Sequence, residues 1–132
     1  MTNKQEYNDV IKKAAIEWLS SLFNVQVHDI KMQSIFGKDL IPPTSGNWGE
    51  NELDDVQAEI AAFQKVISKK TKKKPKEFPA VCTVKDFVTL AQFCFDIDQD
   101  YIQETIKYWK KYCEKALKRK RRKMREISRN ET

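Results

Sequence analysis

The chain has few residues that break helices and few that build covalent or metal-bound scaffolds. It contains three Gly and four Pro among 132 residues, against 40% apolar and 33% charged residues. That balance suits one compact helical domain and is unfavourable for a β-sandwich or a disordered chain. Three separated cysteines without a Cys-x-x-Cys pair, and a single histidine, argue against a disulfide framework, a zinc site or another metal centre.

Long apolar stretches are also missing. No run of 18 apolar residues occurs, so the sequence predicts no membrane-spanning helix. Met1–Glu6 lacks the apolar region of a signal peptide. With the reduced cysteines, these features lead us to expect a cytoplasmic protein.

Charge is distributed very unevenly. Residues 1–104 carry 13 Lys and 16 Asp or Glu, a net charge of −3, whereas residues 105–132 carry 12 Lys or Arg and three Glu, a net charge of +9. We therefore predict a single helical domain over 1–117 and a basic helical extension or tail over 118–132. The densest cations are Lys118, Arg119, Lys120, Arg121, Arg122, Lys123 and Arg125.

Apolar residues at helical spacing predict four helices. The first runs over 5–23, and a long loop over 24–49 docks Val25, Val27 and Ile30 on the core. The second helix starts near Asn51 and ends in a loop at 69–76. Thr83 with Asp86 predicts a capping box for the third, and Asp98 or Asp100 caps the fourth.

The buried stripes of the four helices follow from the same spacing. The residues predicted to be buried are Tyr7, Val10, Ile11, Ala14, Ala15, Trp18, Leu19 and Leu22; Leu53, Val56, Ile60, Phe63 and Ile67; Val84, Phe87, Val88, Ala91 and Cys94; and Ile102, Ile106, Trp109, Cys113, Ala116 and Leu117. Beyond Leu117 the stripe thins to Met124 and Ile127, so we expect the last turns to project or fray.

Three segments occur in an order that resembles the acyl carrier protein family. They are Phe36-Gly37-Lys38-Asp39-Leu40, then Gly49-Glu50-Asn51-Glu52-Leu53-Asp54-Asp55-Val56, then Thr83-Val84. The resemblance covers about residues 8–95 and implies an all-α, acyl-carrier-like four-helix bundle, here with a long basic C-terminal helix. Glu52 stands where the family has the serine that carries phosphopantetheine, and Ser45 lacks the surrounding motif. The resemblance therefore implies a bundle without prosthetic group or other cofactor.

Carrier proteins dock on their enzymes through an acidic second helix, and part of that face is kept here. We accordingly predict a non-catalytic protein-binding module, either an adaptor or an inhibitor of the immunity type acting on another bacterial protein. The predicted partner-binding residues are Trp48, Glu50, Glu52, Asp54 and Asp55. The alternative is a nucleic-acid-associated protein that binds phosphates through Lys118–Arg125, with a further contribution from Lys69–Lys76. The segment Lys118–Arg125 lacks the apolar face of a membrane-surface helix.

Two patterns could have pointed to chemistry. Asp96-x-Asp98-x-Asp100 matches the start of a calcium loop, but Tyr101 replaces the required Gly and Lys107 the bidentate Glu, so we read it as helix capping. His28-Asp29 could suggest a histidine oriented by a carboxylate for acid–base catalysis, but adjacent side chains rarely face each other. In addition, no Ser or Cys is suitably placed in the sequence to act as a nucleophile. We predict that the protein is not an enzyme.

Overall fold

The computed structural model describes residues 2–43 and 51–130, which form an all-helical bundle without strands in these ranges. The helices are α1 (Thr2–Phe23), α2 (Glu52–Thr71), α3 (Val84–Ile97) and α4 (Gln99–Asn130), with short 3-10 turns η1 (Val27–Asp29) and η2 (Pro75–Glu77). The four predicted helices are thus confirmed, and the fold class is all-α.

Side-chain caps fix where α2, α3 and α4 begin. Asn51 and Asp54 form a reciprocal capping box, and so do Thr83 and Asp86. The Asp98 carboxylate accepts a hydrogen bond from the N–H of Tyr101 at 3.2 Å, which makes Asp98 the cap of α4. Each cap satisfies backbone donors that have no partner within the helix. The predicted Thr83–Asp86 box and the Asp98 cap are confirmed.

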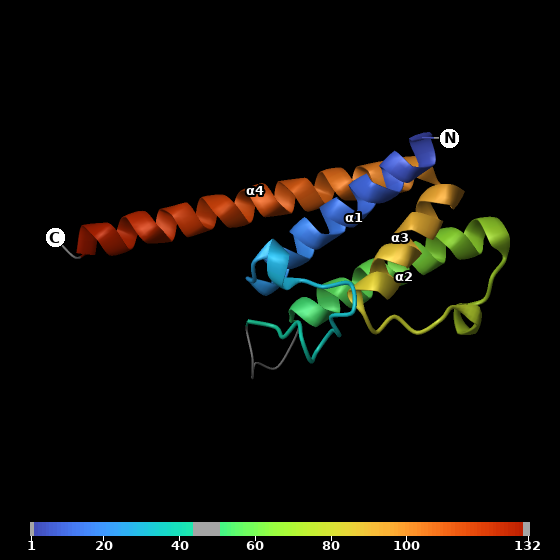
Figure 1. The fold of residues 1–132 in the computed structure, drawn as a ribbon, viewed down its shortest axis with the longest axis horizontal. Coiled ribbons are helices and arrows are strands. Elements are labelled where there is room, and N and C mark those ends of the chain that lie inside the picture. The colour runs from blue at the N-terminus through green and yellow to red at the C-terminus, as the bar shows by residue number, and fades with distance from the viewer. Residues whose placement is uncertain (1, 44–50, 131–132) are drawn as a thin grey trace.

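The helices differ greatly in how much of their length packs against the bundle. α4 lies along α1 over its first half, and α3 packs against α1, α2 and α4. The second half of α4 continues past the end of α1 and past the rest of the bundle (Figure 1). Only the first half of this 32-residue helix therefore packs against the bundle.

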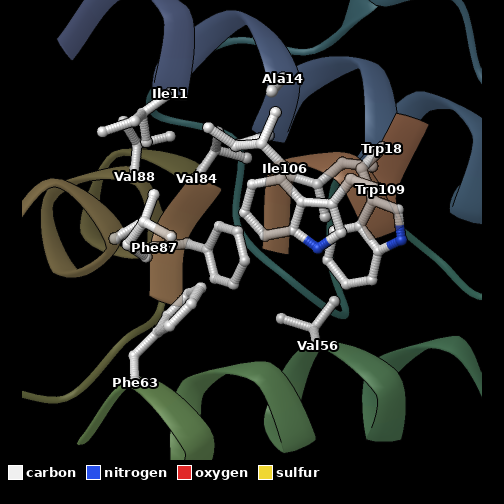
Figure 2. Packing of buried hydrophobic residues seen from close by; sticks show 14 of the residues in the cluster. Ile11, Ala14, Trp18, Val56, Phe63, Val84, Phe87, Val88, Ile106 and Trp109 are labelled. Carbon is white, nitrogen blue, oxygen red and sulfur yellow. The ribbon is translucent and has the colours of Figure 1, made fainter. Parts of the chain in front are cut away.

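Aromatic rings occupy the centre of the core. The Trp18 ring of α1 and the Trp109 ring of α4 stack with centroids 5.3 Å apart and planes 14° from parallel. Phe87 of α3 lies beside this pair, and Phe63 and Val56 reach it from α2 (Figure 2). Neither indole N–H has a hydrogen-bond acceptor among the described residues. The stack is held by ring packing and by the exclusion of water, and both contributions to stability are large for tryptophan because its ring is large.

The predicted stripes are correct in the bundle centre and wrong at three positions. Every predicted residue of α3 is buried, whereas Tyr7, Val10 and Leu117 are exposed, as is Val27 of the predicted loop. Tyr7 still contacts the Phe95 ring and Val10 adjoins the buried Ile11, so both lie at the edge of a packed face. Leu117 lies where α4 leaves the bundle, 50% exposed. Helical periodicity gives the direction in which a side chain points, but burial also requires a neighbouring element at that height.

The connection before α2 is tied to the segment before α3. The N–H of Phe36 donates to the carbonyl of Cys82 at 3.0 Å, and the N–H of Val84 donates to the carbonyl of Ser34 at 3.0 Å. Ile30 is buried and Val25 is half-buried against the core, as predicted. The long loop is therefore docked on the bundle over its described part.

α2 ends later than the sequence indicated. The helix includes residues 69–71, and Lys72 closes it in the left-handed conformation with φ 60°. Residues 75–77 then form η2. The predicted lysine loop over 69–76 is thus wrong in its first three residues, because lysine is a good helix former and the capping geometry first appears at Lys72.

Candidate functional site

The most exposed regular element is the second half of α4. Trp109 is buried, Cys113 and Ala116 are half-buried, and every residue from 117 to 129 is exposed. We call residues 118–129 the basic extension. Lys, Arg, Met and Glu, which favour helices, make up most of it, so the chain stays helical without packing.

Cations surround the basic extension on all sides. Consecutive helical residues are about 100° apart, so the unbroken run from Lys118 to Lys123 already covers the whole circumference. The extension holds eight Lys or Arg and one acidic residue, Glu126. The helix is therefore a positively charged rod rather than an amphipathic surface helix.

Like charges face each other along this rod. Positions four apart are neighbours on a helix, and the pairs 118/122, 119/123, 121/125 and 125/129 are all cationic. Each such pair destabilises an isolated helix by about 0.2–0.5 kcal/mol. A bound polyanion would remove that repulsion, so the rod is best stabilised by negative charge supplied from outside the chain.

The acidic start of α2 is partly engaged in holding its own helix. The Asp54 carboxylate accepts from the N–H of Asn51 at 3.0 Å, while the Asn51 side chain accepts from the N–H groups of Leu53 and Asp54. Asp54 is exposed, but its charge is directed at the capping box. Trp48 and Glu50, the other end of the predicted docking face, lie outside the described residues, as does Ser45.

The remaining acids of α2 lie on the side that approaches α4. Glu52, Asp55 and Glu59 occupy positions i, i+3 and i+7, one face of the helix. Burial and the nearby charge of Asp55 raise the pKa of Tyr112, and burial followed by Asp55 raises the pKa of Glu59 to about 6. The positive charge of Arg119 partly opposes this increase in the pKa of Tyr112. The acidic stripe of α2 and the start of the basic extension therefore both lie near Tyr112.

Residues 36–40 form a tight turn next to the start of α2. Gly37 has φ 86°, and its N–H donates to the carbonyl of Leu40 at 2.9 Å. A Cβ at Gly37 would lie 3.8 Å from the side chain of Leu53, so space is available and the left-handed backbone is what favours glycine. The first two segments of the carrier-like pattern are thus adjacent in space.

The residues weighed for chemistry have very different surroundings. The His28 and Asp29 side chains are 3.6 Å apart and exposed on η1. Burial raises the pKa of the Cys94 thiol to about 12, which keeps it protonated and unreactive. Within 2–43 and 51–130, no three His, Cys, Asp or Glu side chains are grouped to hold a metal ion.

An apolar groove beside α3 was not predicted from the sequence. It has a volume of about 400 Å³ and lies between α3 and the segment that follows α2. Its lining residues are Lys73, Phe78, Pro79, Ala80, Val81, Lys85, Asp86, Thr89, Leu90 and Phe93. One feature of the sequence could have indicated the groove: Phe93 is a large apolar residue that lies outside the predicted buried stripe of α3.

No family model, curated protein or solved structure matches this chain. Function must therefore be argued from the chain's own surfaces. In the part of the chain that the structure describes, no helix combines the length and the apolar character needed to cross a bilayer. α4 is long enough, but its second half is basic.

Proposed function

We propose that the protein binds nucleic acid through the basic extension of α4, and that the helical bundle holds this helix in place. The observation that carries the proposal is a helix that leaves the bundle with exposed residues on every side and eight cations in twelve positions. Apart from Met124 and Ile127, the exposed side chains of this rod are charged or polar. Its chemistry is that of a phosphate-binding surface.

The dimensions of the extension suit a duplex. Twelve helical residues span about 18 Å, and double-stranded DNA carries one phosphate charge per about 1.7 Å of axis. A helix of about 10–12 Å diameter also fits the major groove, which is about 12 Å wide. Several phosphates are therefore within reach of one extension, and their counterions would be released on binding.

Binding by this surface should depend little on sequence. Between 118 and 129 there is no Asn, Gln or aromatic residue, so the side chains that most often read adenine or stack on bases are missing. Lys and Arg contacts to phosphates position a protein without reading bases. We expect strong salt dependence and weak discrimination among sequences.

A second proposal is the non-catalytic protein-binding module on an acyl-carrier-like fold, without prosthetic group because Glu52 replaces the serine. The stripe Glu52, Asp55 and Glu59 on one face of α2 supports it. We rank it second because Asp54 is engaged in capping and the stripe lies towards α4. Neutralising Glu52 and Asp55 should abolish binding to a basic protein partner and leave DNA binding unchanged.

The test of the first proposal is fluorescence anisotropy with labelled duplex DNA of mixed sequence at several salt concentrations. Replacing Lys118, Lys120, Arg121 and Arg122 with Gln should weaken binding by about two orders of magnitude or more and flatten the logarithmic salt dependence by about 0.9 per lost phosphate contact.

The matched control removes the same charge elsewhere. Gln at Lys69, Lys70, Lys72 and Lys74 lowers the net charge equally but leaves the extension intact. If both quadruple variants bind DNA equally weakly, net charge alone governs binding. The proposed role of the extension is then wrong.

A further inference from the structure

The groove beside α3 has the size and lining of a binding site. Its volume of about 400 Å³ lies within the range of about 300–1,000 Å³ that is usual for ligand sites. The walls are mainly apolar, with Phe78 on one side and Leu90 and Phe93 on the other. Phe93 is 42% exposed although it belongs to a helix whose other apolar residues are buried or half-buried. The groove is therefore an apolar recess at the surface.

A lysine is fixed at the mouth of this recess. The Lys73 ammonium lies 5.2 Å from the ring centre of Phe78 and 5.9 Å from that of Phe93. Its backbone is held too, because its N–H donates to the Thr71 hydroxyl at 3.3 Å directly after the left-handed cap at Lys72. The charge is thus placed over the apolar walls rather than left on a mobile side chain.

The charges around the groove are unbalanced. Lys85 joins Lys73 in the lining, and Lys69, Lys70, Lys72, Lys74 and Lys76 lie in the adjoining segment. The one acid of the lining, Asp86, accepts from the N–H groups of Cys82 and Thr83 at 3.1 and 3.0 Å, and these bonds lower its pKa. Its charge is used to cap α3, so the mouth of the groove attracts anions.

We propose that this groove docks an acidic peptide segment of another protein that carries one large apolar side chain. The apolar side chain would enter between Phe78 and Phe93, and flanking carboxylates would meet Lys73 and Lys85. A nucleic-acid backbone would satisfy the lysines but leave the apolar recess empty. An apolar side chain between carboxylates matches both features, which is why we choose the peptide.

The groove is separate from the basic extension. η2 and the C-terminal end of α4 lie at opposite ends of the molecule's long axis in Figure 1. None of the groove's lining residues belongs to α4. Peptide docking therefore goes beyond the proposed function, and either can fail without the other.

The test uses the full chain and a fluorescein-labelled synthetic peptide in which one Phe is flanked by glutamates. Anisotropy gives the affinity, and amide chemical shifts locate the site. Phe93→Ser should weaken binding about tenfold or more, and Lys73→Gln by a smaller factor, since buried aromatic anchors dominate such contacts. Thr89→Glu, which adds a carboxylate to the lining without touching the core, should also weaken it.

Matched controls separate the groove from general surface effects. Val10→Ser replaces another exposed apolar residue, 46% exposed on α1, and Lys110→Gln removes an exposed lysine from α4, which contributes nothing to the groove lining. Both should leave the peptide affinity within about twofold, well below the change expected for a hot spot. A peptide with Gln in place of every Glu should bind much more weakly.

Three results would overturn the proposal. One is equal binding of the peptide to Phe93→Ser, Thr89→Glu and the unaltered protein. Another is displacement of the peptide by duplex DNA that shifts the same groove amides. The third is concentration-dependent self-association that Phe93→Ser abolishes, which would assign the groove to a second copy of this chain.

Discussion

The two halves of α4 are helical for different reasons. In the first half Ile102, Ile106 and Trp109 are buried against α1 and α3, so tertiary packing supports the helix. From 117 to 129 every residue is exposed, and like charges four apart oppose the helix. One continuous helix thus joins a segment whose stability comes from the bundle to a segment whose stability can be increased by a ligand.

The largest expected effect tests the packed half. Trp109→Ala removes a side chain that is 1% exposed and stacked on Trp18, so the free energy of unfolding should fall by about 3–5 kcal/mol. Its neighbour Tyr108 is 57% exposed, and Tyr108→Ala should change it by less than about 0.5 kcal/mol. Urea unfolding followed by circular dichroism measures both. Equal losses would show that burial does not distinguish the two positions.

A second test asks whether acids beside the packed half respond to pH. The pKa of Glu59 is about 6 in the folded protein against 4.5 ordinarily, because of burial and then Asp55. The folded state therefore binds this proton more tightly, and the resulting stability is full below pH 4.5 and lost as pH rises through 6.

Glu59→Gln should accordingly stabilise the protein at pH 7 and change little at pH 4. A pKa displacement of this size corresponds to about 2 kcal/mol, which solvent screening of a half-buried carboxyl reduces to about 1 kcal/mol. Thermal unfolding at the two pH values measures the difference. The control is Glu104→Gln at an exposed carboxyl of α4, 3.3 Å from Lys107, where less than about 0.5 kcal/mol is expected at either pH. An equal gain at both pH values would contradict the assignment to Glu59 ionisation.

The smallest effect concerns the unpacked half. Arg119→Glu and Arg121→Glu would turn the pairs with Lys123 and Arg125 from repulsive to attractive, with Glu on the favourable N-terminal side. Each change should stabilise the extension by a few tenths of a kcal/mol, seen as roughly twofold slower amide exchange beyond Leu117. Raising the salt concentration should slow exchange in the unaltered protein and have less effect in the double variant.

Sequence patterns predicted the elements better than their environments. The start of α3 and five of its six buried residues were predicted, because the Thr83–Asp86 capping box marked its start and apolar residues at helical spacing marked one face; buried Phe95 was missed. Leu117 was wrong because periodicity does not say where the neighbouring helices stop. Tyr7 and Val10 were wrong for another reason: Tyr7 contacts the Phe95 ring and Val10 adjoins the buried Ile11, so both lie at the edge of a packed face that periodicity made too wide.

The candidate surfaces show the same division. The cationic run Lys118–Arg125 is visible in the sequence, and its projection as a helix was one of two expected outcomes. The groove was invisible because its walls come from an irregular segment and from α3, which only the folded chain brings together. Within the predicted acidic face, Asp54 caps its own helix, and Trp48 and Glu50 lie outside the described residues.

The stacked tryptophans give the protein an optical reporter at the joint where α4 meets the bundle. Two indoles with ring centres 5.3 Å apart couple their electronic transitions, and this coupling produces a paired positive and negative band in circular dichroism when the two transition dipoles are rotated relative to each other within the stack. That signal depends on the docking of Trp109 against Trp18, whereas the peptide bands depend only on helix content. Loss of the coupled bands at constant helix content would therefore show when α4 separates from α1, without any label on the chain.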